Sequence, residues 1–195
     1  MASPVAHGLA AVALVWLAGR RPPPTADSAL AHRPVGRAHE LTTAVITAVA
    51  ADFDFIPGLV IGDAGAFHRG PTHSLAAAAV FGAVAFLAAR RWDLPSPGRI
   101  ALVLGIVFAS HLGIDLLTTD YGEPSGVPLF WPVSSQNVSL PVHLFVYIRH
   151  TGEDGGLAPA LFSAHNARAI LREALIMGPV LAAARLARKS LRSTT

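Results

Sequence analysis

Apolar residues are gathered in five runs along the chain, and polar residues lie mainly between them. The runs are residues 4–19, 41–62, 74–89, 100–119 and 169–187. None shows the period-2 alternation of a half-buried strand, and Ala and Leu dominate, which favours helices. A helix that crosses a bilayer needs about 20 residues, and the three middle runs approach this length with few charges. The pattern predicts an all-α, polytopic membrane bundle of about five helices.

The first run resembles a membrane anchor more than a signal peptide. A signal peptide carries basic residues before its apolar stretch, whereas Arg20 and Arg21 follow this one. The last run is interrupted by Arg172, Glu173 and Arg185. A soluble all-helical enzyme with an unusually apolar core therefore remains an alternative, which detergent-free fractionation would separate from the membrane protein.

Basic residues lie in three stretches, 20–37, 90–99 and 185–192, which hold eleven of the fifteen Lys and Arg residues. Cytoplasmic loops of membrane proteins carry such an excess. Five helices with the N-terminus outside and the C-terminus in the cytoplasm put all three stretches on the cytoplasmic face. We therefore expect a multi-pass inner-membrane protein. Because orientation explains the basic charge, no nucleic-acid partner is expected.

The segments between the runs predict one membrane-embedded domain over residues 1–195. Residues 20–40 are rich in Pro and Arg and indicate an extended cytoplasmic segment. Residues 120–168 predict a long extracytoplasmic loop whose aromatic side chains form a cap at the membrane interface. Residues 188–195 form a basic tail.

Composition narrows the chemistry. The chain is 52% hydrophobic and 14% charged, against about 25% charged residues in a typical soluble domain. Disorder, a coiled coil and a disulfide scaffold are excluded, and the absence of Cys excludes thiolate metal sites and thiol catalysis. Nine His against twelve Asp and Glu residues is unusual for so apolar a chain, and it directs attention to where the histidines lie.

Ionisable residues inside membrane helices are costly, and this makes them candidates for function. His111 and Asp115 are four residues apart, so they stand on one face of a helix and could bind one metal ion. Asp52 and Asp54 flank Phe53. Two carboxylates this close raise each other's pKa unless a cation lies between them.

The segment from His68 to Ser74, His-Arg-Gly-Pro-Thr-His-Ser, is the most specific in the chain. Pro71 suits the first turn of a helix, so His68 and His73 would lie near its start and face one cavity. In the predicted topology they share the outer membrane face with four acids and histidines of the runs and with His7. We expect His32 and His39 to be solvated and His143, His150 and His165 to lie at the surface.

These seven residues predict a centre for a divalent metal. Imidazole with carboxylate suits Zn(II), and Mn(II) or Fe(II) is not excluded. Four His and three Asp exceed the needs of one tetrahedral ion, so two ions are an option. We expect His68, His111 and Asp115 as core ligands, joined or bridged by Asp54. The remaining members would supply a second metal, support for the ligands, or a general acid or base: His7, Asp52 and His73.

Two neighbouring residues, Arg69 and Ser74, carry functional groups of their own. Arg69 could hold a substrate phosphate. Ser74 has no dedicated base beside it in the sequence, so a nucleophilic role is not favoured.

Five elements together resemble the YdjM-like family: His7, Asp52-Phe-Asp54, the His68–Ser74 segment, His111-x-x-x-Asp115 and Pro128-Leu-Phe-Trp-Pro132. Its members are membrane-bound, metal-dependent hydrolases, also described as LexA-binding and inner-membrane-associated. The resemblance covers roughly residues 5–135. It implies a helical membrane enzyme whose His and Asp residues bind metal. The order of these residues is also similar to that of the ligands in zinc-dependent phospholipase C enzymes, without their downstream His-x-x-x-Glu.

The predicted function is hydrolysis of an ester or phosphodiester. The expected partners of the protein are membrane lipid and a small-molecule or lipid-linked substrate. The oligomeric state is not predicted. A transporter or proton-coupled channel is one alternative, but it should continue the polar path toward the cytoplasm, where the helices hold Ala, Val and Leu. A regulatory protein that binds a soluble partner through residues 20–40 is another, and it leaves the buried acids unexplained.

Overall fold

The structure, a computed structural model, describes residues 2–19, 37–62, 66–119, 125–149 and 157–193. These residues form helices joined by irregular connections and contain no strand, only two isolated bridges, Thr118 with Phe145 and Val127 with Val138. The elements are α1 (Pro4–Leu17), α3 (Arg37–Ala48), the 3-10 helix η1 (Ala50–Asp54), α4 (Phe55–Val60), the 3-10 helix η2 (Pro71–His73), α5 (Leu75–Arg91), α6 (Pro97–Leu116), α7 (Leu157–Leu161) and α8 (Ala164–Ser193). The predicted all-α class is confirmed.

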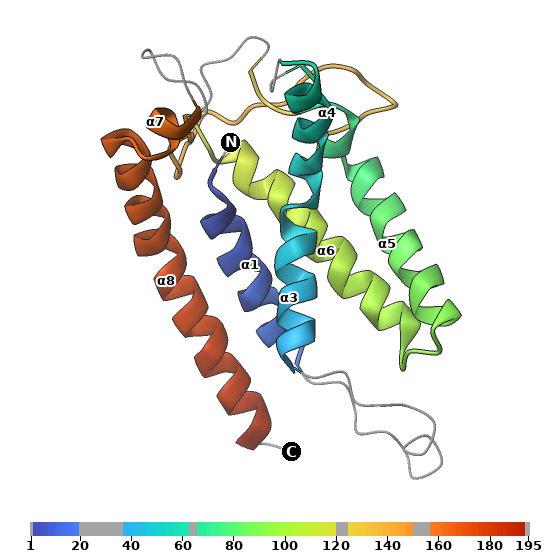
Figure 1. Cartoon of the computed structure of the whole chain (residues 1–195). Helices are drawn as coiled ribbons and strands as arrows, with labels where there is room; N and C mark the ends of the chain where they lie inside the picture. Colours follow the sequence, from blue (N-terminus) through green and yellow to red (C-terminus); the bar gives the residue numbers. More distant parts are fainter. Residues whose placement is uncertain (1, 20–36, 63–65, 120–124, 150–156, 194–195) are drawn as a thin grey trace.

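Each of the five apolar runs contributes a long helix or a helical pair (Figure 1). Local signals explain where several of them begin. Ser3 caps α1 by accepting a hydrogen bond from the amide of Val5, and Ser74 caps α5 by accepting one from Ala77. Pro4 and Pro97 occupy the first turns of α1 and α6, where a missing N–H costs nothing.

The second run is not a straight helix. The segments Ala38–Ala48 and Ala50–Val60 are bent by 53° relative to each other, and Val49 lies at the break. Both carboxylates of this run, Asp52 and Asp54, lie on η1 just beyond the bend. The break therefore places them where the regular pairing of backbone groups is interrupted.

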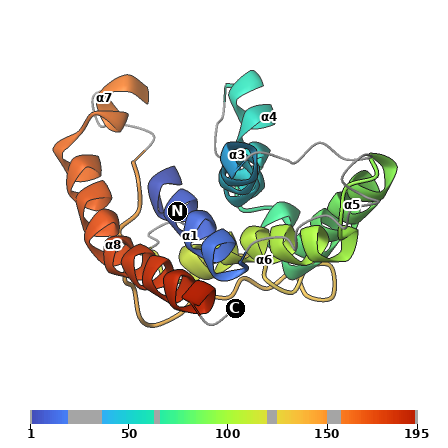
Figure 2. The ribbon, with the colours of Figure 1, turned by 90° about the horizontal axis from the view of Figure 1, so that it is seen from below.

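Helix α6 lies at the centre of the bundle. It packs against α5, α1 and α3, while α1 also packs against α3 and α8. Seen along the bundle, α8 and α5 lie at opposite edges, with α1, α3 and α6 between them (Figure 2). The beginnings of α1 and α5 and the end of α6 all lie at the same end of the molecule (Figure 1).

Small residues allow the helices to approach closely. Buried Ala side chains of α1 and α3 form a core with Val107 of α6. On α5, a Cβ added at Gly82 would come within 3.4 Å of the carbonyl oxygen of Ala101. Such small-residue contacts are typical of helix packing in membranes.

Among the described residues, only Pro97–Leu116 is by itself long and apolar enough to cross a membrane. The bent pair Ala38–Ala48 and Ala50–Val60 passes the same test if counted as one span, and Pro4–Leu17 is apolar but shorter.

Helix α8 begins earlier than its apolar run indicates. The sequence predicts that the preceding loop extends to residue 168, but α7 starts at Leu157 and α8 at Ala164. The reason is local polar chemistry, since Ser163 accepts a hydrogen bond from the amide of Asn166 and so caps the helix without any apolar pattern. Helix α8 also continues to Ser193, into the predicted basic tail. The predicted cytoplasmic segment 20–40 falls largely on residues 20–36, outside the described part of the chain.

Candidate metal centre

Seven side chains from four parts of the chain converge at one end of the bundle. His7 comes from α1, His111 and Asp115 from the last turns of α6, His73 from η2 and His68 from the turn before it, and Asp52 and Asp54 from η1. The four on α1, α6 and η2 are buried. The side chains of Asp52, Asp54 and His68 are 13%, 8% and 12% exposed, so the cluster opens to its surroundings on their side.

Four of the seven form a compact set, which we call the four-residue group: Asp52, His73, His111 and Asp115. The Nε2 atoms of His73 and His111 are 3.3 Å apart. From His73 Nε2 to Asp52 Oδ1 and Asp115 Oδ2 the distances are 3.5 and 3.6 Å. From His111 Nε2 to the same oxygens they are 3.3 and 3.5 Å. His111 and Asp115 therefore lie in the same group, as their i, i+4 spacing predicts.

These distances match the edges of a coordination tetrahedron. A zinc ion with bonds of about 2.0–2.1 Å in tetrahedral geometry separates its ligand atoms by about 3.3–3.4 Å. Asp52 Oδ1 and Asp115 Oδ2 are buried, yet neither has a hydrogen-bond partner among the described residues. Buried carboxylate oxygens normally have partners. The four donor atoms therefore face a common centre in the way that a divalent cation requires.

The outer nitrogen of His111 has a fixed partner. His111 Nδ1 lies 2.8 Å from the carbonyl oxygen of Ala48, and a carbonyl can only accept, so Nδ1 carries the proton. Nε2 is then the nitrogen that faces the four-residue group, where a metal ion would take its lone pair. Ala48 is the last residue of α3, and carbonyls in the last turn of a helix have no partner within the helix. The bend in the second run therefore makes this carbonyl available to His111.

A second set, the three-residue group, consists of Asp54, His68 and His73. His68 Nδ1 lies 3.1 Å from Asp54 Oδ1, and His73 Nδ1 lies 3.2 Å from Asp54 Oδ2. His73 is common to both groups and presents one ring nitrogen to each. A carboxylate that holds the outer nitrogen of a metal-binding His orients the ring and raises its basicity, and Asp54 has this position relative to His73.

His7 lies beside the four-residue group without joining it. Its ring stacks on that of His111, with centroids 4.0 Å apart and planes at 18°. Its Nε2 is 3.6 Å from Asp115 Oδ1, the oxygen that also accepts a hydrogen bond from the amide of Ala2 at 3.3 Å. His7 is fully buried, and its ring nitrogens have no hydrogen-bond partner among the described residues.

The acids around His73 determine its protonation. Burial lowers the pKa of His73, but the contacts with Asp52 and Asp54 and the charge of Asp115 outweigh that effect. The pKa of His73 consequently lies above its ordinary value of 6.5. In the metal-free protein the ring takes the place of a cation between the carboxylates.

Sequence reasoning missed one side chain of the cluster. Thr72 donates a 2.6 Å hydrogen bond to Asp54 Oδ2, and its Oγ1 lies 3.1 Å from His73 Nδ1. Its position inside the His68–Ser74 segment was the available signal. The carbonyl of Ala48 and the amide of Ala2 had no signal, because any residue type offers these backbone groups.

The structure also places the other candidates. Ser74 Oγ donates to the carbonyl of Pro71 and accepts from the amide of Ala77, so it is occupied as a helix cap. Arg69 is half-buried and has a left-handed backbone (φ 60°), a costly conformation for a non-glycine residue that is often found at functional sites. His39 and His143 are exposed as predicted. His165 bonds the carbonyl of Tyr147, and His32 and His150 lie outside the described residues.

Comparison with known proteins identifies the family of the chain. A family model described as YdjM inner membrane protein matches residues 1–190. No curated protein and no solved structure matches the chain. The matched range contains every residue of both groups and nearly the whole sequence. The resemblance seen in the sequence is thereby confirmed, and the chain belongs to the YdjM inner membrane protein family.

Proposed function

We propose that the protein is a membrane-embedded, metal-dependent hydrolase of esters or phosphodiesters. The observation that carries the proposal is the spacing of three buried donor atoms, His73 Nε2, His111 Nε2 and Asp115 Oδ2, which lie 3.3–3.6 Å apart as three vertices of a coordination tetrahedron do. Two imidazoles with carboxylates favour Zn(II), while Mn(II) and Fe(II) use similar ligands.

The four residues differ in burial, and this difference suggests which of them bind metal and which takes part in catalysis. His73, His111 and Asp115 are buried, and three protein ligands with one open position are typical of catalytic zinc sites. Asp52 lies on the partly open side of the group. We assign the three buried residues to metal binding, which leaves the fourth position of the tetrahedron for a water molecule, and we assign Asp52, whose side chain borders that position, to general base catalysis. The three-residue group, with His68 and Asp54, is the place for a second ion.

A bound divalent ion would polarise the substrate oxygen and acidify a water molecule. Asp52 Oδ1, which has no hydrogen-bond partner among the described residues, is suited to accept the proton of the attacking water. Asp54 keeps His73 oriented through Nδ1. Arg69, next to His68 in the chain, would neutralise phosphate oxygens of the substrate.

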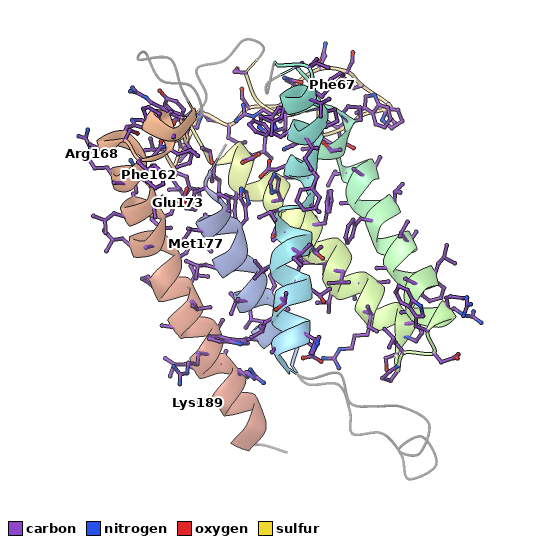
Figure 3. The ribbon with its side chains drawn as sticks, viewed as in Figure 1. Phe67, Phe162, Arg168, Glu173, Met177 and Lys189 are labelled. Atoms are coloured by element: carbon purple, nitrogen blue, oxygen red, sulfur yellow. The ribbon has the colours of Figure 1, made fainter. Side chains whose placement is uncertain are left out.

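The surroundings of the open side favour a lipid-linked substrate. Phe53, Ile56 and Phe67 are exposed, and they are close in sequence to Asp52, Asp54 and His68. Phe67 lies at the end of the bundle where α6 ends (Figure 3). Apolar rings at this level suit a membrane interface. We therefore propose a membrane lipid or another amphiphile with an ester or phosphate group as substrate, and a multi-pass bundle with its N-terminus outside.

The test uses purified full-length protein in detergent. We expect bound zinc by elemental analysis and hydrolysis of bis(p-nitrophenyl) phosphate or a p-nitrophenyl ester. The double variant His111→Ala/Asp115→Ala should lose the metal, whereas the exposed His143→Ala control should keep it. Asp52→Asn should keep the metal and lose activity. Unchanged metal content in the double variant would overturn the proposal.

One observation favours a second candidate, a proton-coupled transporter. Transporters place ion sites at breaks in membrane helices, and η1 lies at such a break. Proton-driven uptake into vesicles without any hydrolysis of the two model substrates would support this alternative.

A further inference from the structure

We infer that Glu173 of α8 is a positioning residue for the candidate metal centre and acts through the segment that leads into α1. The inference rests on the proposed function, since it concerns the same metal site. Its starting point is a buried carboxyl group outside both groups described above.

Glu173 is fully buried on α8, and in Figure 3 its label lies between α8 and α1. A buried carboxylate is costly unless it is hydrogen-bonded. Glu173 accepts three hydrogen bonds from the beginning of α1: from the amide of Ser3 at 2.6 Å, from the hydroxyl of Ser3, and from the amide of Ala6 at 3.3 Å. The carboxylate thus lies at the positive end of a helix.

Ser3 passes this restraint to its neighbours. Its hydroxyl oxygen also accepts a hydrogen bond from the amide of Val5 at 3.1 Å, so one side chain is tied both to α8 and to the first turn of α1. Ser3 and the preceding Ala2 are buried. The backbone of this segment is therefore held in one position relative to α8.

The next residue along this path reaches the metal centre. The amide of Ala2 donates to Asp115 Oδ1, and the other oxygen of Asp115 faces His73 and His111. His7, one turn into α1, also lies 3.6 Å from Asp115 Oδ1. By anchoring α1, Glu173 therefore fixes where the Ala2 amide and His7 lie relative to Asp115 Oδ1. Their positions in turn orient Asp115 Oδ2 toward the metal centre. Mutation of a group that orients a metal ligand typically lowers metal affinity 10–100-fold.

Asn166 provides a matched control on the same helix. It is as buried as Glu173, and its side chain also makes several hydrogen bonds, to Arg149 and to the carbonyl of Ala160. Neither Arg149 nor Ala160 belongs to either metal group. Asn166→Ala should therefore reduce stability without changing the metal site.

The test compares Glu173→Gln, Ser3→Ala, Ser3→Thr and Asn166→Ala with the wild type, each as full-length protein in detergent. Zinc affinity is measured by chelator competition, ligand geometry by the visible spectrum of the Co(II)-loaded protein, and stability by thermal unfolding. We expect Glu173→Gln and Ser3→Ala to bind zinc about 10–100-fold more weakly and to shift the Co(II) bands. Ser3→Thr, which keeps the hydroxyl, should restore both, and Asn166→Ala should change only the unfolding temperature.

The outcomes separate this inference from the proposed function. A wild-type protein that binds no metal overturns both. A wild type that binds zinc, together with Glu173→Gln and Ser3→Ala variants of unchanged affinity and Co(II) spectrum, overturns only the positioning role of Glu173.

Discussion

His73 presents its two ring nitrogens to different partners, and this arrangement decides how the candidate metal centre responds to pH. Nε2 belongs to the four-residue group, while Nδ1 faces Asp54 and Thr72. A metal ion competes with a proton for the first nitrogen. The second nitrogen is held in place by its acidic and hydroxyl neighbours.

The first prediction at this scale concerns the stability of the metal-free protein. The folded-state pKa of His73 is raised above the ordinary 6.5. The resulting stabilisation is complete below pH 6.5 and is lost as the pH rises through the folded-state pKa. We therefore expect the unfolding temperature of chelator-treated protein to fall as the pH rises above 6.5 and through the raised folded-state pKa of His73.

Added zinc should have the opposite dependence, because binding displaces the proton of His73. The shift in unfolding temperature caused by zinc should grow with pH over the same interval. The exposed His143→Ala variant should show the wild-type profile. Metal-free stability that increases with pH would contradict this account.

Thr72 is the subject of the second prediction. Replacing it by Val keeps the shape but removes the hydroxyl that donates to Asp54 Oδ2. Asp54 is then less well oriented toward His73, and zinc affinity should fall about tenfold. Thr72→Ser, which retains the hydroxyl, is the control and should remain near the wild type in chelator competition. Equal affinities of the Val and Ser variants would show that the hydroxyl has no such role.

At the scale of elements, the contact of α5 with α6 depends on the absence of side chains. Gly82 lies against the carbonyl of Ala101, and a Cβ added at Gly105 would come within 3.7 Å of the Cα of Gly82. Both sides of the contact are backbone, which cannot move aside as a flexible side chain can. The α5–α6 contact also places η2, which immediately precedes α5, beside the end of α6.

The third prediction follows from this contact. Gly82→Leu should force the two helices apart and lower the free energy of unfolding by about 1–3 kcal/mol. Gly113→Leu on α6 is the control, because a Cβ there meets nothing within 4 Å and the gain in helix propensity is the same. Thermal unfolding in detergent measures both. A Gly82→Leu variant as stable as Gly113→Leu would mean that the close approach is not required.

At the scale of the molecule, the start of α1 and the end of α6, which carry His7, His111 and Asp115, lie at the opposite end of the bundle from the end of α8 (Figure 1). The loop 125–149 lies on the cluster side, since the amide of Leu75 bonds the carbonyl of Leu129. The basic end of α8 lies at the other. In the proposed orientation the cluster faces outward, and the basic end faces the cytoplasm.

The fourth prediction tests this orientation by labelling. The chain contains no Cys, so single cysteines can be placed at two exposed positions, Gln136→Cys in the loop and Ser190→Cys near the end of α8. In intact cells a membrane-impermeant maleimide should label position 136 and not position 190. Permeabilised cells should show label at both. The reverse pattern would invert the proposed orientation, and labelling of both in intact cells would exclude it.

Much of this molecule follows from local features of its sequence. Apolar runs predicted the helices, because hydrophobic periodicity is a property of neighbouring residues. The i, i+4 spacing put His111 beside Asp115 for the same reason. The cost of ionisable groups in apolar helices singled out Asp52 and Asp54, and the structure brings all seven chosen residues together.

Only the tertiary structure decided how the seven are divided. It joined His73 and Asp52 with His111 and Asp115, aimed Asp54 at the outer nitrogen of His73, and left His7 stacked at the side. It also supplied the carbonyl of Ala48 at a helix break and the restraint by Glu173. These are contacts between backbone and side-chain atoms far apart in the chain, and they depend on how the helices pack, which no local pattern of residue types records.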